Sequence, residues 1–389
     1  MKDKISNIID SLSDKLKEIA SKIFDYAEIA YEEYKSSDEL AKFLEENGFE
    51  VQRKVGGLET AIVGKYGSGK PIIAFIGEYD ALPEIGHACG HNMIGTISAG
   101  AAVALAKLGI LEQNQGTVMF IGTPAEERGT GKRILLDAGV FDNVDAALMI
   151  HPSSETAAFS DSFTVEHYKV EFFGKPAHAA SKPYEGVNAL DAVNLFFTGI
   201  ALARQQLPER IRLHGIVKVG GQAFNIIPEY TMAEIGIRTL DDETQRKVTE
   251  RVKNIAKGAA LMTGCDYKME LLTTVKRVLS NEPIGKSLEE NFKLVGEKVT
   301  KRTYEKGVGS TDMGDVTHAV PGIHGYIGVT KGKEVPGHTH EFAQCCNSTE
   351  GYEAMIRATK ALAMTGYDLF SDPELLKNAK EYFEKTSKK

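Results

Sequence analysis

Hydrophobic residues recur every three or four positions at the start of the chain and then give way to short apolar runs. The first spacing predicts a helix over residues 4–33, with the stripe Ile5, Ile8, Ile9, Leu12, Leu16, Ile19 and Ile23. A second helix is expected to begin at Ser36, with Glu39 completing a capping box, and to end at Gly48. Strands and helices then alternate, with strands at 49–54, 60–66, 71–77, 117–122 and 146–151 and helices at 92–108 and 130–138. This alternation favours a largely parallel sheet flanked by helices.

The pattern changes at residue 164. The elements expected there are strands at 164–173, 213–219, 230–239 and 267–275 and helices at 187–206 and 241–263. Their β-α-β-β-α-β order is typical of a ferredoxin-like α+β domain. Helices at 283–300 and 348–366 resume the first pattern, and the lysine-rich end is expected to fray. We therefore predict an α/β chain with a discontinuous main domain, 1–163 and 276–389, and an inserted domain, 164–275.

Composition narrows the functional class. The 389 residues are 42% hydrophobic and 26% charged, which is ordinary for globular domains. A net charge of -8 argues against a large basic surface for nucleic acid. No apolar run reaches the ~18 residues that span a bilayer, and the first residues lack the apolar core of a signal peptide. Four cysteines without framework spacing suit a reducing compartment, so we expect a cytoplasmic protein with neither membrane nor nucleic-acid partners.

Three loops at predicted strand ends carry candidate metal ligands. Cys89 and His91 lie two residues apart, with a glycine between them, although one such pair can equally be structural. Glu126 and Glu127 follow the strand GTVMFIG; one could bind a metal while the other acts as a base, or both could begin a solvated helix. His151 ends the strand AALMI. Because such loops meet at one edge of a parallel sheet, the three together favour a metal centre.

Other motifs leave alternatives open or are rejected. His338 and His340 offer further imidazoles, and we favour His338 as a ligand. Cys89 with His91 could instead form a thiol nucleophile, but two residues on one loop give poor geometry and leave the glutamates unexplained. Residues 64–70 have the spacing of a phosphate loop, yet Pro71 and a strand follow, so we expect a hairpin turn.

The motifs together resemble metallopeptidase family 20, the aminoacylase and carboxypeptidase family. The resemblance is closest to the branch of aminobenzoyl-glutamate hydrolase and of dipeptidases acting on Xaa-Arg or β-alanyl-lysine peptides. The matching segments follow the family's order and are GEYDALPEIGHACGHN, GTPAEE, MIHP, GKPAHAA, PYEGVNALDA, GGQAFNIIPEYTMAEIGIRTLD, GSTDMGD and PGHTHEF. Two positions depart from it: Asn92, where many relatives carry Asp, and Glu78, where relatives often carry Asp or His.

The resemblance implies an amidohydrolase with two divalent metal ions, zinc first, with manganese, cobalt and nickel as alternatives. Glu126 would be the general base, and Asp80 would orient His91. Cys89 would bridge the ions, and His91 and Glu127 would bind opposite ions. The complete ligand set implied by the resemblance is Cys89, His91, Glu127, His151 and His338.

The resemblance also makes 1–163 and 276–389 the catalytic domain and 164–275 a lid and dimerisation domain. His178 would reach the active site of the partner in a homodimer, and Asn225 and Arg238 would hold the substrate carboxylate. Without the resemblance, His178 is a surface residue and Arg238 a member of an ion pair on a sheet. The implied substrate is a small N-acyl amino acid or dipeptide with a free carboxylate. A catalytically inactive dimeric relative is the remaining alternative, but every ligand position is filled.

Overall fold

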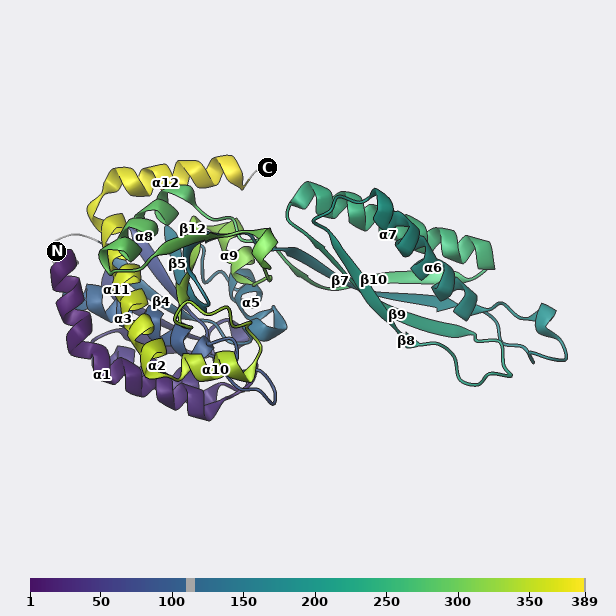
Figure 1. Cartoon of the computed structure of the whole chain (residues 1–389), viewed down its shortest axis with the longest axis horizontal. Helices are drawn as coiled ribbons and strands as arrows, with labels where there is room; N and C mark the ends of the chain where they lie inside the picture. The colour runs from purple at the N-terminus through teal and green to yellow at the C-terminus, as the bar shows by residue number, and fades with distance from the viewer. Residues whose placement is uncertain (110–115, 388–389) are drawn as a thin grey trace. The chain divides into compact units, whose positions relative to one another are not determined.

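The computed structural model describes residues 1–109 and 116–387, which form two compact units (Figure 1). Unit 1 combines Met1–Asp161 with Val278–Lys389, and unit 2 is the segment Ser162–Arg277 between them. The α/β fold class is confirmed: a large, mostly parallel sheet with helices in unit 1 and a ferredoxin-like α+β arrangement in unit 2. Among the described residues, no helix is both long and apolar enough to cross a membrane.

Unit 1 holds eight strands in one sheet, in the order β1-β2-β4-β3-β5-β12-β6-β11. Their bounds are β1 Glu50–Arg53, β2 Ile62–Ser68, β3 Ile72–Gly77, β4 Gly116–Gly122, β5 Ala146–Ser153, β6 Thr156–Ser160, β11 Val299–Arg302 and β12 Gly322–Gly328. The central run β4-β3-β5-β12 is parallel, whereas β1 and β2 run antiparallel at one edge. The carboxyl ends of the four central strands therefore lie along one edge of the sheet.

The helices of unit 1 cover both faces of this sheet. They are α1 Lys2–Tyr26, α2 Tyr34–Glu46, α3 His91–Lys107, α5 Gly131–Asp137, α8 Glu282–Leu294, α9 Met313–Ala319, α10 His340–Cys346, α11 Thr349–Ser371 and α12 Pro373–Thr386, with short 3-10 turns η1 Val55–Gly57, η2 Glu126–Arg128 and η5 Tyr304–Lys306. Helices α1, α3 and α11 pack side by side (Figure 1).

Alternation along the central strands builds two hydrophobic cores. On β3, Ile73 and Phe75 enter the core shared with α1, α3 and α11, whereas Ala74 and Ile76 enter the core shared with α5 and α9. Because side chains of a strand point to opposite faces in turn, the continuous apolar run 72–76 is the expected sequence of a strand that is buried on both sides. Burial of this run fixes the strand ends, and with them the loops that follow.

Several sequence predictions about unit 1 are wrong in detail. The first helix ends at Tyr26, not at residue 33. Ser36 is no helix cap: α2 begins at Tyr34, and the buried Ser36 hydroxyl donates to Glu28 Oε2 at 2.8 Å. Residues 64–70 form no hairpin, because β4 separates β2 from β3 in the sheet.

The C-terminal third departs from the prediction in the same way. Residues 299–302, expected at the end of a helix, form β11 beside β6. The lysine-rich end does not fray over its described part, because helix α12 continues to Thr386. Three further elements, β12, α9 and α10, have no counterpart among the predicted elements.

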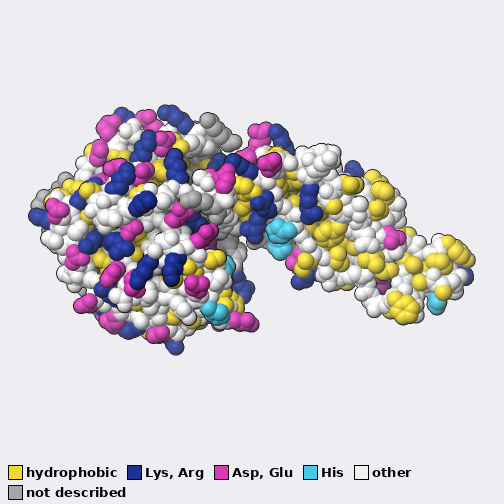
Figure 2. Space-filling view, in the orientation of Figure 1, with side chains coloured by type: hydrophobic (Ala, Val, Ile, Leu, Met, Phe, Trp, Pro, Cys, Tyr) yellow, Lys and Arg dark blue, Asp and Glu magenta, His cyan; other side chains and the backbone are white. Residues whose placement is uncertain are grey.

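Unit 2 has the predicted β-α-β-β-α-β order. Its elements are β7 Thr164–Phe173, α6 Ala189–Ala203, β8 Arg212–Val219, β9 Tyr230–Thr239, α7 Asp242–Thr263 and β10 Asp266–Val275, with the turns η3 Pro183–Glu185 and η4 Arg204–Gln206. The antiparallel sheet runs β10-β7-β9-β8, and α6 and α7 share a core with it. Figure 2 shows hydrophobic side chains on the visible face of this unit. Its exposed large apolar residues include Ile216, Val217, Phe224, Leu261 and Met262.

Candidate metal centre

Four loops or strand ends of unit 1 bring the predicted ligands together. Cys89 precedes α3 and His91 is its first residue, whereas Glu127 lies in η2 after β4. His151 lies on β5, and His338 precedes α10. Among the described residues, two groups have donor atoms that all lie within 4.8 Å of one another: Cys89 with His91 and His151, and Cys89 with Glu127 and His338.

Cys89 is common to both groups, as a ligand between two ions would be. Its Sγ lies 3.4 Å from His151 Nε2, on one side of the centre. On the other side, His338 Nε2 lies 3.7 Å from Glu127 Oε2. His338 is held by a hydrogen bond from its backbone N–H to the Ala88 carbonyl at 2.8 Å. Of the two histidines left open by the sequence, His338 belongs to such a group, and His340 begins α10.

The ring of His91 is oriented by the carboxylate of Asp80. Its Nδ1 lies 2.9 Å from Asp80 Oδ1, which leaves Nε2 to face Glu126 and Glu127 at 3.9 Å each. A histidine that binds a metal commonly donates its other ring N–H to a carboxylate in this way. His91, Glu126 and Glu127 form a third group of close donors.

Unpaired buried atoms show that this donor set fits a cation. Among the described side chains, His91 Nε2, Glu127 Oε1 and Glu78 Oε2 are buried without a hydrogen-bond partner. Leaving such groups unpaired costs about 1–3 kcal/mol each, and more where they are charged. Thiol, imidazole and carboxylate donors are the ligands that zinc and neighbouring divalent ions accept. The residues present therefore fit a divalent metal centre.

Burial governs the protonation of Cys89 and Glu126. Desolvation raises the pKa of the Cys89 thiol to about 12, which disfavours a free thiolate nucleophile. Desolvation, followed by the charges of Glu78 and Asp312, raises the pKa of the Glu126 carboxyl well above its usual range. A cation at the centre would shift both groups back toward their charged forms. Glu126 thus lies where its proton affinity responds strongly to nearby charge.

A buried lysine balances the carboxylates behind the centre. Lys132 Nζ contacts Glu78 Oε1 and Asp312 Oδ1 at 2.5 Å each, and all three side chains are fully buried. Burial opposes ionisation of Glu78, but Lys132 and then His91 lower its pKa to about 2. Neither Lys132 nor Asp312 was predicted as a site residue, although Asp312 lies in the quoted motif GSTDMGD. That motif was the only signal that could have found them.

The backbone on both sides of Glu126 is held by buried carboxylates. The Ala125 N–H donates to Glu33 Oε1 at 2.8 Å, and the Glu127 N–H donates to Asp80 Oδ2 at 3.0 Å. Ala125 has φ 60° and ψ 40°, the left-handed region. For a residue with a Cβ this conformation costs roughly 1–2 kcal/mol, so neighbouring contacts must maintain it. Glu33 was not among the predicted site residues.

We expect replacement of Glu33 by glutamine to change how stability depends on pH. Burial raises the pKa of the Glu33 carboxyl from 4.5 to about 7. Between these values the unfolded chain releases the proton first, so rising pH destabilises the folded state. Glu33→Gln removes this effect. Its melting temperature relative to the parent protein should therefore rise between about pH 5 and about pH 8, measured on metal-free protein. The exposed neighbour provides the control, Glu32→Gln; equal differences at both pH values would contradict the expectation.

The predicted substrate-binding residues lie in unit 2. His178 forms an isolated bridge with Ile226, and its Nδ1 accepts from the backbone N–H groups of Ala180 and Ser181 at 3.2 Å. The Asn225 carbonyl accepts from the Ala179 N–H at 3.0 Å, so the two segments are neighbours.

Arg238 has a separate setting on β9 of unit 2. Its Nε lies 3.4 Å from His214 Nε2 on the adjacent strand β8. This contact is with an imidazole, whereas the alternative to a substrate role was an ion pair on the sheet.

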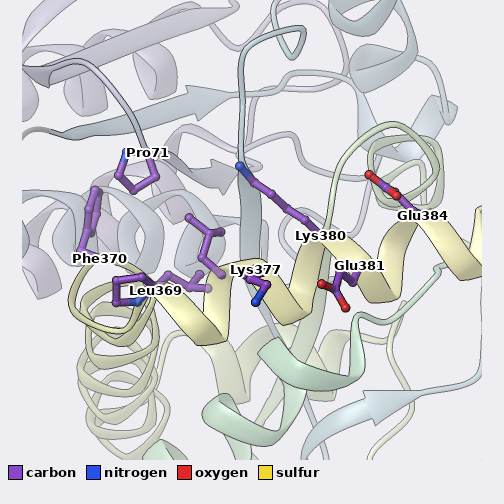
Figure 3. Close-up of a pocket in the computed structure, with 9 residues that line it drawn as sticks. Pro71, Leu369, Phe370, Lys377, Lys380, Glu381 and Glu384 are labelled. Atoms are coloured by element: carbon purple, nitrogen blue, oxygen red, sulfur yellow. The ribbon is translucent and has the colours of Figure 1, made fainter.

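A separate pocket in unit 1 has a different character. Figure 3 shows Pro71 and Phe370 at one end of it and Glu384 of α12 at the other. Its described lining contains no histidine or cysteine. The metal-binding chemistry of the described chain therefore lies at the strand ends and not in this pocket.

Comparison with known proteins places this geometry in context. The sequence model of Peptidase family M20/M25/M40 matches residues 74–365. The chain is 35% identical to the Xaa-Arg dipeptidase of Mus musculus, over 98% of this chain and 92% of the relative. It is 31% identical to a p-aminobenzoyl-glutamate hydrolase of Escherichia coli, over 97% and 93%. A Bacillus subtilis structure described as a dinuclear metal binding peptidase shares the fold, with a TM-score of 0.74, 20% identity and coverage of 93% and 99%.

Proposed function

This chain belongs to Peptidase family M20/M25/M40 and is a hydrolase of amide bonds, and from this premise we propose a specific reaction. The proposed reaction is metal-dependent hydrolysis of the amide in a small N-acyl amino acid or dipeptide that has a free carboxylate. The observation that carries the proposal is the pair of three-donor groups that share Cys89, with Glu126 beside them.

The proposed centre holds two divalent ions, with zinc the first choice. Cys89 lies between them, and Asp80 keeps His91 turned toward the centre. When bound, the ions would polarise the scissile carbonyl and lower the pKa of the attacking water. The proposed ligands are Cys89, His91, Glu127, His151 and His338.

Glu126 is the proposed general base. Its carboxylate accepts a proton from the attacking water and later delivers that proton to the nitrogen of the leaving amine. The high proton affinity that burial gives this carboxyl suits a group that must hold a proton between the two steps. The neighbouring Glu127 is directed to the second donor group and is left out of proton transfer.

Unit 2 supplies the proposed substrate contacts as a lid and dimerisation domain. Asn225 and Arg238 would bind the substrate carboxylate, and His178 of the partner subunit would polarise the carbonyl. Because the Nδ1 atom of His178 accepts two backbone hydrogen bonds, the neutral ring carries its proton on Nε2, the form that can donate to a carbonyl oxygen. The exposed apolar side chains of unit 2 support a homodimer. A cytoplasmic location remains part of this proposal.

A substrate panel tests the proposed substrate class. Relatives named for Xaa-Arg dipeptides and p-aminobenzoyl-glutamate supply the first two candidates, each paired with its primary carboxamide. Loss of a charged hydrogen bond is worth about 1.5–3 kcal/mol, so kcat/KM for the amide should fall by about 10-fold to 100-fold. Arg238→Gln should remove most of this preference. Equal turnover of acids and amides by the parent protein would contradict the carboxylate requirement.

A further inference from the structure

The segment that carries Glu126 is held by its backbone at two points on either side. The Ala125 N–H donates to Glu33 and the Glu127 N–H donates to Asp80, so alternate N–H groups bind two different buried carboxylates. Asp80 is already explained, because it also orients His91. Glu33 contacts no proposed ligand, and it lies 92 positions before Ala125 in the chain. Its carboxylate therefore needs an explanation of its own.

The surroundings of Glu33 fix that carboxylate in place. Glu33 is fully buried immediately before α2, and its backbone carbonyl accepts the Ser37 N–H at 3.0 Å. Its Oε2 accepts from the Thr60 hydroxyl at 2.7 Å, and the Thr60 carbonyl accepts from the buried Tyr79 hydroxyl at 2.6 Å. This chain of bonds leaves Oε1 aimed at the Ala125 N–H. A buried carboxylate held by three elements is a rigid acceptor.

The bond from Ala125 controls an unfavourable backbone conformation. Ala125 is fully buried with φ 60°, a region that alanine avoids and glycine tolerates. If the N–H lost its acceptor, the peptide before Ala125 could rotate toward an ordinary conformation. Glu126 is the next residue, so such a rotation would redirect its side chain.

We propose that Glu33 is a positioning residue that holds Ala125 in the left-handed conformation and thereby aims Glu126 at the reacting atoms. This inference rests on the proposed role of Glu126 as general base. Glu33 touches neither substrate nor metal in this proposal. It should therefore influence kcat and leave KM and metal content nearly unchanged.

Four variants test the proposal, measured with the best substrate of the panel and with bound metal quantified for each protein. Glu33→Ala should lower kcat by about 10-fold to 100-fold, the size of effect that a displacement of about 1 Å has on a catalytic group. Glu33→Gln keeps an acceptor at the same place and should retain most of kcat. Glu33→Asp withdraws the acceptor by one methylene and should fall between the two. Glu32→Ala, at the exposed adjacent glutamate, is the matched control and should behave as the parent protein.

A second substitution separates positioning from general destabilisation. Glycine adopts positive φ without a Cβ clash, so adding Ala125→Gly to Glu33→Ala should recover part of the lost kcat. If Glu33 merely supports the core, glutamine and alanine would lose activity in proportion to their loss of melting temperature, and glycine would recover none; either result overturns the proposal. Glu33→Asp serves if Glu33→Ala does not fold. Glu126→Gln is assayed alongside: if it stays active the base assignment fails, whereas an inactive Glu126→Gln with a fully active Glu33→Ala refutes the positioning role alone.

Discussion

Glu126→Gln should lower kcat by about 10³-fold while the protein stays folded and keeps its metal. The amide preserves the size of the side chain, but it cannot take a proton from water. Glu126 lies beside His91 at 3.9 Å and outside the two groups that share Cys89, so the ligand set survives the change. Steady-state kinetics together with metal analysis of the purified variant provide the measurement.

The adjacent glutamate supplies the contrast. Glu127→Gln alters a donor of the group formed with Cys89 and His338, so this variant should lose both bound metal and activity. Two neighbouring substitutions of the same kind are thus expected to differ in metal content. Full turnover by Glu126→Gln, or equal metal loss in the two variants, would show that the roles of the glutamates are wrongly assigned.

Removal of metal should abolish turnover, and Cys89→Ala should prevent its recovery. After chelation, addition of zinc, manganese, cobalt or nickel singly should restore activity to the parent protein and identify the preferred ion. Cys89 belongs to both donor groups, so its loss weakens both sides of the centre. Loss of one ligand or of its supporting contacts commonly costs about 10-fold to 100-fold in metal affinity or activity, and a shared ligand should cost more.

Cys345→Ala is the control for this experiment. Cys345 is a second partly exposed cysteine, and it is absent from the close donor groups of the described residues. Its variant should regain activity with added metal. The same pair decides the thiol alternative: activity that survives thorough chelation and still disappears in Cys89→Ala would favour cysteine as the nucleophile.

The candidate centre could be predicted from the sequence because its residues follow strands whose pattern is unambiguous. Runs such as 71–77 are apolar on both faces, and the loop after each parallel strand must emerge at the same edge of the sheet. The elements of unit 2 were predicted for the same reason, since β7 alternates regularly over ten residues. Resemblance then added His338, which no local pattern could connect to Cys89.

The parts that were missed depend on contacts between distant segments. Lys132 reads as an ordinary helix lysine, yet it is fully buried between Glu78 and Asp312, 54 and 180 positions away. Glu33 lies in a run of charged and aromatic residues that predicts only a helix. The hairpin between β2 and β3 was wrong for a related reason, because β4 enters between them from later in the chain. Local periodicity contains no information about such partners.

The two ends of unit 2 are hydrogen-bonded neighbours. Val165 on β7 pairs with Val275 on β10, and the Arg277 N–H donates to the Thr164 hydroxyl at 3.0 Å. The chain therefore leaves unit 1 and returns to it at nearly the same point, about 5 Å apart across a strand pair. To unit 1 the whole insertion is equivalent to a short closed loop, and the entropy of loop closure grows only slowly with the length enclosed. Exchange of this segment for another with paired ends would cost the sheet of unit 1 little, so substrate choice could diverge while the metal-binding half stays intact.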